Sequence, residues 1–184
     1  MKCIHGHNYK DDLISGDELF HLREEAPEEN SEVNYPKDKP DWYETPFETL
    51  LEGLRLKHYP ELPSREKCFF AFRCRDCALF FRDNSARNNQ YYLCTVHPLS
   101  ITKISNHDMP FTDASIIKNY DPKLVEEFAH AYWRKKSITD CLEKNETRPE
   151  TLIYGKLKFI ELEKSPVTIE LEELQRKLEL GELP

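Results

Sequence analysis

The sequence predicts a single domain of the mixed α+β class. The apolar patterns along the chain follow the order strand, loop, helix, strands, helix, strand and helix. A parallel α/β sheet would instead need a regular alternation of strands and helices. The chain has 184 residues, of which 39% are hydrophobic, and it is therefore long enough to bury one core.

The first part of the chain predicts one strand and a long connection. Residues 18–22 form a short apolar run that is typical of a strand. Residues 23–44 are acidic, carry three prolines and keep no hydrophobic period, so we expect a long loop there. Residues 1–16 are polar and are expected to form a separate N-terminal segment.

The first helix is expected to begin directly after Thr45. The Thr45 side chain can cap the helix, Pro46 occupies the first helical position, and Glu48 completes a capping box. The apolar side chains at helical spacing are Phe47, Leu50, Leu51 and Leu54. We expect the helix to end before Pro60, because the residue that precedes a proline avoids the helical region.

The middle of the chain predicts strands around a short helix. A nearly continuous apolar run at residues 68–72 is typical of a buried strand. A short helix is expected over residues 76–82, and two further strands over residues 91–96 and 99–104. Pro98 lies between these two strands and is expected to separate them.

A second helix and a strong strand follow. Asp121 is placed to cap this helix and Pro122 to open it. Its expected inner face consists of Val125, Phe128, Ala129 and Tyr132. The apolar segment at residues 152–160 predicts a strand, with Gly155 at a bulge or turn.

The C-terminal segment predicts a helix with a narrow apolar stripe. Leu171, Leu174 and Leu178 recur at a spacing of three to four residues before Gly181. We therefore divide the chain into a main domain, residues 17–162, and a helical extension, residues 163–184. The leucine stripe can pack on its own domain, or it can dock a partner or a second copy of the chain.

Charge and cysteine content limit the classes of function. The net charge of −8 opposes a general attraction to nucleic acid or to anionic membranes. No stretch reaches the ~20 consecutive apolar residues that a membrane helix needs, and the first residues do not resemble a signal peptide. We therefore expect a cytoplasmic protein that does not bind membranes and whose six cysteines are reduced.

A cysteine cluster gives one hypothesis for a metal site. Two residues separate Cys74 from Cys77, and two residues likewise separate Cys94 from His97. Three thiolates and an imidazole suit tetrahedral zinc, which would stabilise an interaction domain. The apolar residues that follow Cys77 favour the alternative, in which these cysteines are core residues and zinc is absent.

Several polar residues occupy positions typical of functional sites. His21 lies at the end of the first predicted strand, and Glu150 opens the strand that follows the second helix. Arg65, preceded by Ser64, lies just before the buried strand and could clamp a phosphate in a bidentate manner or pair with an acidic side chain.

The order of these motifs resembles that of an uncharacterised bacterial domain family, which looks like a divergent branch of the ADP-ribosyltransferase superfamily. The similarity covers residues 17–160. The motifs that carry it are Leu19–Leu22, Tyr59–Arg65 leading into Phe69–Phe72, His107–Met109, Ala131–Trp133 and Pro149–Ile153. Members of the superfamily bind NAD in a cleft of a split β-sheet, so the resemblance implies a split, mostly antiparallel sheet flanked by helices.

The resemblance also implies a set of NAD-binding residues. In the histidine–tyrosine–glutamate class, His21 would hold the nicotinamide end of NAD and Glu150 would stabilise the oxocarbenium-like transition state at the ribose. The matching strand carries Phe70 and Phe72 instead of the tyrosine, and these rings could stack on nicotinamide. Ser64 and Arg65 could approach the ribose or the pyrophosphate.

The sequence is therefore compatible with three functions. The resemblance implies an NAD-dependent ADP-ribosyltransferase whose acceptor is a protein or a nucleic acid. A second possibility is a non-catalytic module that binds NAD, another nucleotide or a partner protein. The third is the zinc-stabilised interaction domain.

Overall fold

The fold was analysed in a computed structural model of the whole chain. The structure describes residues 18–23, 26–37, 45–84, 92–112, 121–138, 148–164 and 166–180. The predicted N-terminal segment, residues 1–16, lies outside the described residues, as does Gly181. Among the described residues, no helix has the length and apolar character that a membrane span requires.

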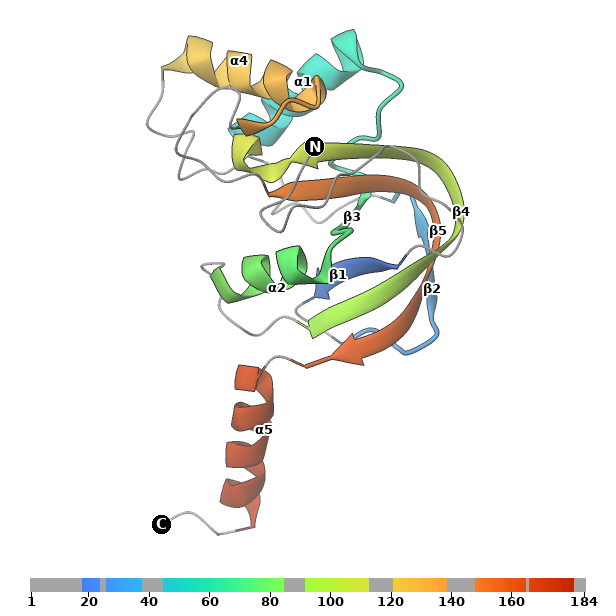
Figure 1. Cartoon of the computed structure of the whole chain (residues 1–184), viewed down its shortest axis with the longest axis vertical. Helices are drawn as coiled ribbons and strands as arrows, with labels where there is room; N and C mark the ends of the chain where they lie inside the picture. The colour runs from blue at the N-terminus through green and yellow to red at the C-terminus, as the bar shows by residue number, and fades with distance from the viewer. Residues whose placement is uncertain are drawn as a thin grey trace.

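One antiparallel sheet organises the domain (Figure 1). Its strands are β1 (Leu19–Arg23), β2 (Glu32–Tyr35), β3 (Phe69–Ala71), β4 (Tyr92–Asp108) and β5 (Pro149–Glu163). Their order is β1-β4-β5-β2, and β3 also pairs with β5. The helices are α1 (Pro46–His58), α2 (Arg75–Asn84), α4 (Pro122–Trp133) and α5 (Pro166–Glu179), with a short 3-10 helix, η2 (Met109–Thr112). The predicted α+β class and the mostly antiparallel sheet are confirmed.

The paired strands β4 and β5 bend together into a C shape (Figure 1). The register shifts on both sides of Ile101, the residue that pairs with Gly155. A Cβ atom at Gly155 would lie 2.1 Å from the carbonyl oxygen of Ser100, so the bend requires glycine at this point. The predicted irregularity at Gly155 is therefore confirmed.

Two expectations about the strands are wrong. Pro98 does not separate two strands, because β4 runs through it and Pro98 pairs with Leu157. A register shift lies directly after Pro98, and such an irregularity tolerates the missing N–H group. The expected loop at residues 23–44 contains β2, which has only two apolar residues and depends on its pairing with β5.

The bend gives the sheet a concave face and a convex face. We call concave the face on which Leu19, Phe69 and Ile153 pack together in one apolar cluster. A bridge between Phe20 and Phe72 joins β1 to β3 through backbone hydrogen bonds of 2.8 and 2.7 Å. Strands β1, β3 and the first half of β5 are therefore neighbours.

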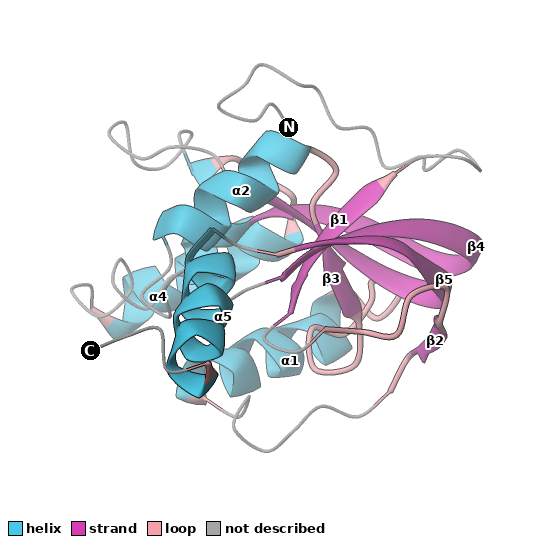
Figure 2. Ribbon diagram, turned by 90° about the horizontal axis from the view of Figure 1, so that it is seen from below, coloured by secondary structure: helices cyan, strands magenta, loops and turns pink. Residues whose placement is uncertain are grey.

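Helices α1, α2 and α4 pack against the sheet, whereas α5 extends away from it (Figures 1 and 2). A second apolar cluster joins α1 and α4 to the convex face of β5; its members include Trp133, Tyr132, Phe111, Phe128 and Leu152. A third cluster packs α2 against Phe72 and Leu93. The Trp133 indole N–H donates to the Leu51 carbonyl oxygen at 2.9 Å, which fixes α4 on α1.

The two predicted helix starts are confirmed. The Thr45 hydroxyl accepts from the Glu48 N–H at 3.1 Å, and Asp121 accepts from the N–H groups of Lys123 and Leu124. The expected second half of the capping box at Thr45 differs, because the Glu48 carboxylate binds Arg65 instead. Tertiary pairing has here replaced a local contact.

Asp108 links the end of β4 to the segment after α4 and to the residue before β5 through hydrogen bonds. Its carboxylate accepts from the N–H groups of Ile138 and Arg148, each at 2.7 Å, and from the Ser137 hydroxyl at 3.3 Å. Burial raises the pKa of Asp108 to about 6, although these donors act in the opposite direction. The folded protein therefore holds the Asp108 proton more tightly than the unfolded chain does.

This raised pKa predicts a specific pH dependence of stability. Because the native state binds the extra proton, the free energy of unfolding should fall as the pH rises from about 4 to about 6, by at most about 3 kcal/mol from Asp108 alone. Urea unfolding of the wild type and of Asp108→Asn across this range isolates the effect. The variant should lose this slope, whereas Asp121→Asn, which preserves a helix cap, should keep it. Parallel pH profiles for all three proteins would contradict the assignment.

Candidate functional site

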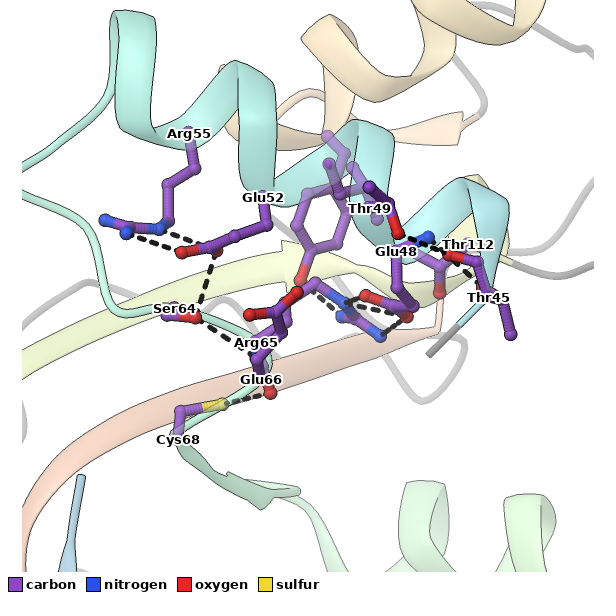
Figure 3. Close-up of polar contacts among 12 residues, drawn as sticks. Thr45, Glu48, Thr49, Glu52, Arg55, Ser64, Arg65, Glu66, Cys68 and Thr112 are labelled. Atoms are coloured by element: carbon purple, nitrogen blue, oxygen red, sulfur yellow. Dashed lines mark hydrogen bonds and ion pairs between the residues drawn. The ribbon is translucent and has the colours of Figure 1, made fainter. Parts of the chain in front are cut away.

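Arg65 is the centre of a buried polar cluster beneath α1 (Figure 3). Its Nε and Nη2 atoms donate to the Glu48 carboxylate at 3.0 and 3.1 Å. Its Nη1 atom donates to Glu150 and, at 2.6 Å, to the Tyr132 hydroxyl. One guanidinium thus binds side chains from α1, α4 and β5.

Tyr132 and Glu150 are linked directly within this cluster. The Tyr132 hydroxyl donates to Glu150 Oε1 at 2.8 Å. Burial raises the pKa of Tyr132 well above its usual range, so the hydroxyl keeps its proton and continues to donate. Tyr132 is fully buried and Glu150 is 4% exposed, so water cannot replace these contacts.

Aromatic rings enclose the guanidinium group of Arg65. Its Cζ atom lies 4.9 Å from the centre of the Phe70 ring and 5.1 Å from that of Tyr132. The His107 ring stacks on Tyr132 with 4.3 Å between ring centres, and its Nδ1 atom lies 2.8 Å from the Tyr132 carbonyl oxygen. These contacts hold the cluster in one arrangement.

Ser64 belongs to a second polar group beside the first (Figure 3). Its hydroxyl donates to Glu52 at 3.0 Å, and Glu52 also accepts from Arg55 at 2.7 and 2.9 Å. This ion pair raises the pKa of Arg55 above its usual value. Glu48 and Glu52 are four residues apart on α1, so both carboxylates face the segment that carries Ser64 and Arg65.

The predicted pyrophosphate contacts are therefore already occupied. Ser64 is 2% exposed and Arg65 is 6% exposed, and each binds a carboxylate of α1. A phosphate would have to displace Glu48 or Glu150 from Arg65. The geometry instead gives Arg65 the task of holding Glu150 in place and compensating its charge.

His21 occupies a different environment on the concave face. Its Nδ1 atom lies 2.7 Å from the Phe70 carbonyl oxygen, and its ring centre lies 4.2 Å from that of Phe69. The Tyr35 ring meets the same Phe69 ring at 5.3 Å, edge to face. His21 and Tyr35 both keep partly exposed surface, whereas Phe69 is buried.

The structure does not bring His21 and Glu150 into one cluster. Their strands are close, because β3 lies beside both β1 and β5. Their side chains point to opposite faces, since His21 packs on Phe69 and Glu150 lies with the Arg65 that covers Phe70. Phe72 packs with Phe81 of α2, at 5.6 Å between ring centres, and is not beside His21.

The four residues of the zinc hypothesis are also divided. Cys74 and Cys77 pack in the apolar cluster under α2, and Cys94 packs in the cluster on the concave face. Burial raises the pKa of Cys94 to about 11, which keeps its thiol protonated. Among the described residues there is no group of three or more His, Cys, Asp or Glu side chains that could hold a metal ion. The His97 side chain is 37% exposed and lies 3.9 Å from Glu18.

Residues 13–165 match the family model described as "Protein of unknown function (DUF2441)". The chain belongs to the DUF2441 family. The matched range includes the Arg65 cluster and His21, whereas α5 follows it. No curated protein matches the chain.

The sequence did not predict that Glu48 and Tyr132 bind Arg65, that Glu52 and Arg55 form the polar group beside them, or that Tyr35 packs on Phe69 in this DUF2441 domain. The spacing of Glu48 and Glu52 places both carboxylates on one side of the predicted helix, but the sequence does not indicate that Arg65 is the partner of Glu48. Tyr132 was assigned only to an apolar face. Tyr35 lay in the expected loop, and its proximity to Phe69 depends on the unexpected strand β2.

The Tyr132 hydroxyl should contribute measurably to the stability of the DUF2441 domain. Tyr132→Phe removes a donor to Glu150 and an acceptor for Arg65, so we expect the free energy of unfolding to fall by about 2–3 kcal/mol. Tyr154→Phe is the matched control, because the Tyr154 hydroxyl accepts from the backbone N–H of Ser64 at 2.8 Å. Tyr154→Phe should lower the free energy of unfolding by about 1 kcal/mol, measured in urea. Equal losses in the two variants would argue against a special role for the Arg65 cluster.

Proposed function

We propose that this domain binds NAD and holds the nicotinamide end on the concave face, at His21 and Tyr35. The observation that carries the proposal is the aromatic group around Phe69, on which the rings of His21 and Tyr35 both pack. Both rings are partly exposed, so they offer a planar ligand an edge and a surface for stacking. The hydrogen bond at His21 Nδ1 fixes the orientation of the imidazole.

The arrangement of strands supports the resemblance to ADP-ribosyltransferases. Strand β1 with His21, strand β3 with its phenylalanines and strand β5 with Glu150 are neighbours. Tyr35 supplies the tyrosine that β3 lacks, from β2 instead. We also propose that the sheet is split in the way known from ADP-ribosyltransferases and that NAD binds where it opens.

The pyrophosphate requires a positive charge, and Arg23 is placed to provide it. Arg23 follows His21 by two residues on β1, so both side chains point to the concave face. The Arg23 guanidinium lies 5.7 Å from the centre of the Phe159 ring, which is also 6.3 Å from His21. Arg23 thus takes the role that the sequence had suggested for Arg65.

The same geometry favours NAD binding over transfer catalysed by Glu150. An oxocarbenium-like transition state is stabilised by a negative charge that faces it. The Glu150 charge is compensated by Arg65 and lies on the convex face, away from His21. The proposed function is therefore that of an NAD-binding ADP-ribosyltransferase-like domain in which Glu150 maintains the fold, and no transfer to a protein or nucleic acid acceptor proceeds through it.

Calorimetric titration with NAD tests this proposal. His21→Ala should weaken NAD binding at least about tenfold, equivalent to about 1.4 kcal/mol, because the fixed imidazole is lost. His58→Ala is the matched control, since His58 is exposed at the end of α1. Glu150→Gln should bind NAD with unchanged affinity while unfolding at a lower urea concentration.

Three results would contradict different parts of the proposal. An absence of NAD binding by the folded wild type, or equal affinity in His21→Ala, would remove the site on the concave face. Nicotinamide release by the wild type that disappears in a folded Glu150→Gln variant would instead make Glu150 catalytic.

A further inference from the structure

Helix α5 extends away from the domain (Figure 1), and some of its leucine side chains are exposed. Leu174 is 49% exposed and Leu178 is 64% exposed. They lie four residues apart, so they share one side of the helix. An apolar side this exposed on a projecting helix indicates a surface that a partner covers.

The length of α5 makes its stability as an isolated helix marginal. An isolated helix shorter than ~12–15 residues is marginal in water, because nucleation is costly. The 14 residues of α5 are at this limit. Packing of the apolar side against another helix would supply the stabilisation that the sheet does not provide.

The sequence spacing along α5 is that of a coiled-coil seam. Val167, Leu171, Leu174 and Leu178 follow one another at intervals of four, three and four residues. This is the alternation with which two helices pack side by side. Two copies of α5 can pair antiparallel so that position 167 lies opposite 178 and position 171 opposite 174.

The charges beside the seam select this antiparallel arrangement. Glu170 and Lys177 each immediately precede a seam position, so they lie on the same edge of the helix. In the antiparallel pair, Glu170 of each copy lies beside Lys177 of the other, which gives two attractive pairs. In a parallel pair, the position opposite Glu170 would be the uncharged Gln175.

We infer that the occupant of the apolar side of α5 is α5 of a second copy of this chain, bound antiparallel. The charge pattern is self-complementary in this arrangement, which is why a second copy fits. The contact is small, so the dimer should be weak and concentration-dependent, with a dissociation constant on the order of 10–100 µM.

Sedimentation equilibrium of the full chain tests the seam. The wild type should show a reversible monomer–dimer equilibrium, and the double variant Leu174→Glu/Leu178→Glu should remain monomeric with an unchanged circular dichroism spectrum in the near ultraviolet. A wild type that is monomeric up to about 200 µM would overturn the inference. Dimerisation of the leucine variant with wild-type affinity would also overturn it, because the contact would then lie elsewhere.

Charge reversal tests the orientation. Glu170→Lys alone and Lys177→Glu alone should each weaken self-association at least tenfold, because each places like charges opposite one another. An equimolar mixture of these two variants should regain wild-type affinity, since every facing pair is then attractive. Failure of the mixture to associate would contradict the antiparallel arrangement.

A control separates the seam from the stability of the helix itself. Lys177 pairs within α5 with Glu173, with 3.1 Å between Nζ and Oε1. Glu173→Gln removes this same pair without changing the edge of the seam. Its dissociation constant should stay within twofold of the wild type, and a tenfold loss would show that the charge variants act on the helix instead.

Discussion

The arrangement of α1 and α4 over the sheet depends on the hydrogen bonds and ion pairs of the buried Arg65 guanidinium. This guanidinium joins Glu48 of α1, Tyr132 of α4 and Glu150 of β5, which are distant in sequence. A buried charge of this kind is costly unless its partners are complete, and here two carboxylates and a hydroxyl surround it. The removal of any one partner leaves at least one buried polar atom of the cluster without its hydrogen bond, so the cluster constrains all three elements at once.

The bend of β4 and β5 determines which side chains can act together. It creates two faces, and the alternation of a strand sends His21 to one and Glu150 to the other. The neighbouring positions of β1, β3 and β5 support our proposal that the domain binds NAD. The opposite directions of the two side chains explain why we propose that the domain binds NAD without using Glu150 in a reaction.

Local signals in the sequence were sufficient for several elements. The caps at Thr45 and Asp121 depend on residues three positions apart at most, and both helices begin where expected. The irregularity at Gly155 was also visible, because glycine inside an apolar run has few other uses. The α+β class followed from the order of these elements.

Features that depend on pairing across the sheet could not be predicted. Strand β2 has four residues with little hydrophobic pattern, and it forms because it pairs with β5. The partners of Arg65 come from positions 48, 132 and 150, and no local pattern connects them. The side chains of His21 and Glu150 lie on opposite faces of the sheet because of the register in which β3 pairs with its neighbours, and this register could not be predicted either.

A double-mutant cycle between Arg65 and Glu150 tests the central claim most directly. The unfolding free energies of the wild type, Arg65→Met, Glu150→Gln and the double variant give the coupling between the two side chains. If Arg65 holds Glu150 in the fold, the coupling should be about 2 kcal/mol or more, and the double variant should be more stable than the sum of the single changes predicts. A coupling below about 0.5 kcal/mol would show that Glu150 is not held by Arg65 and would contradict the account.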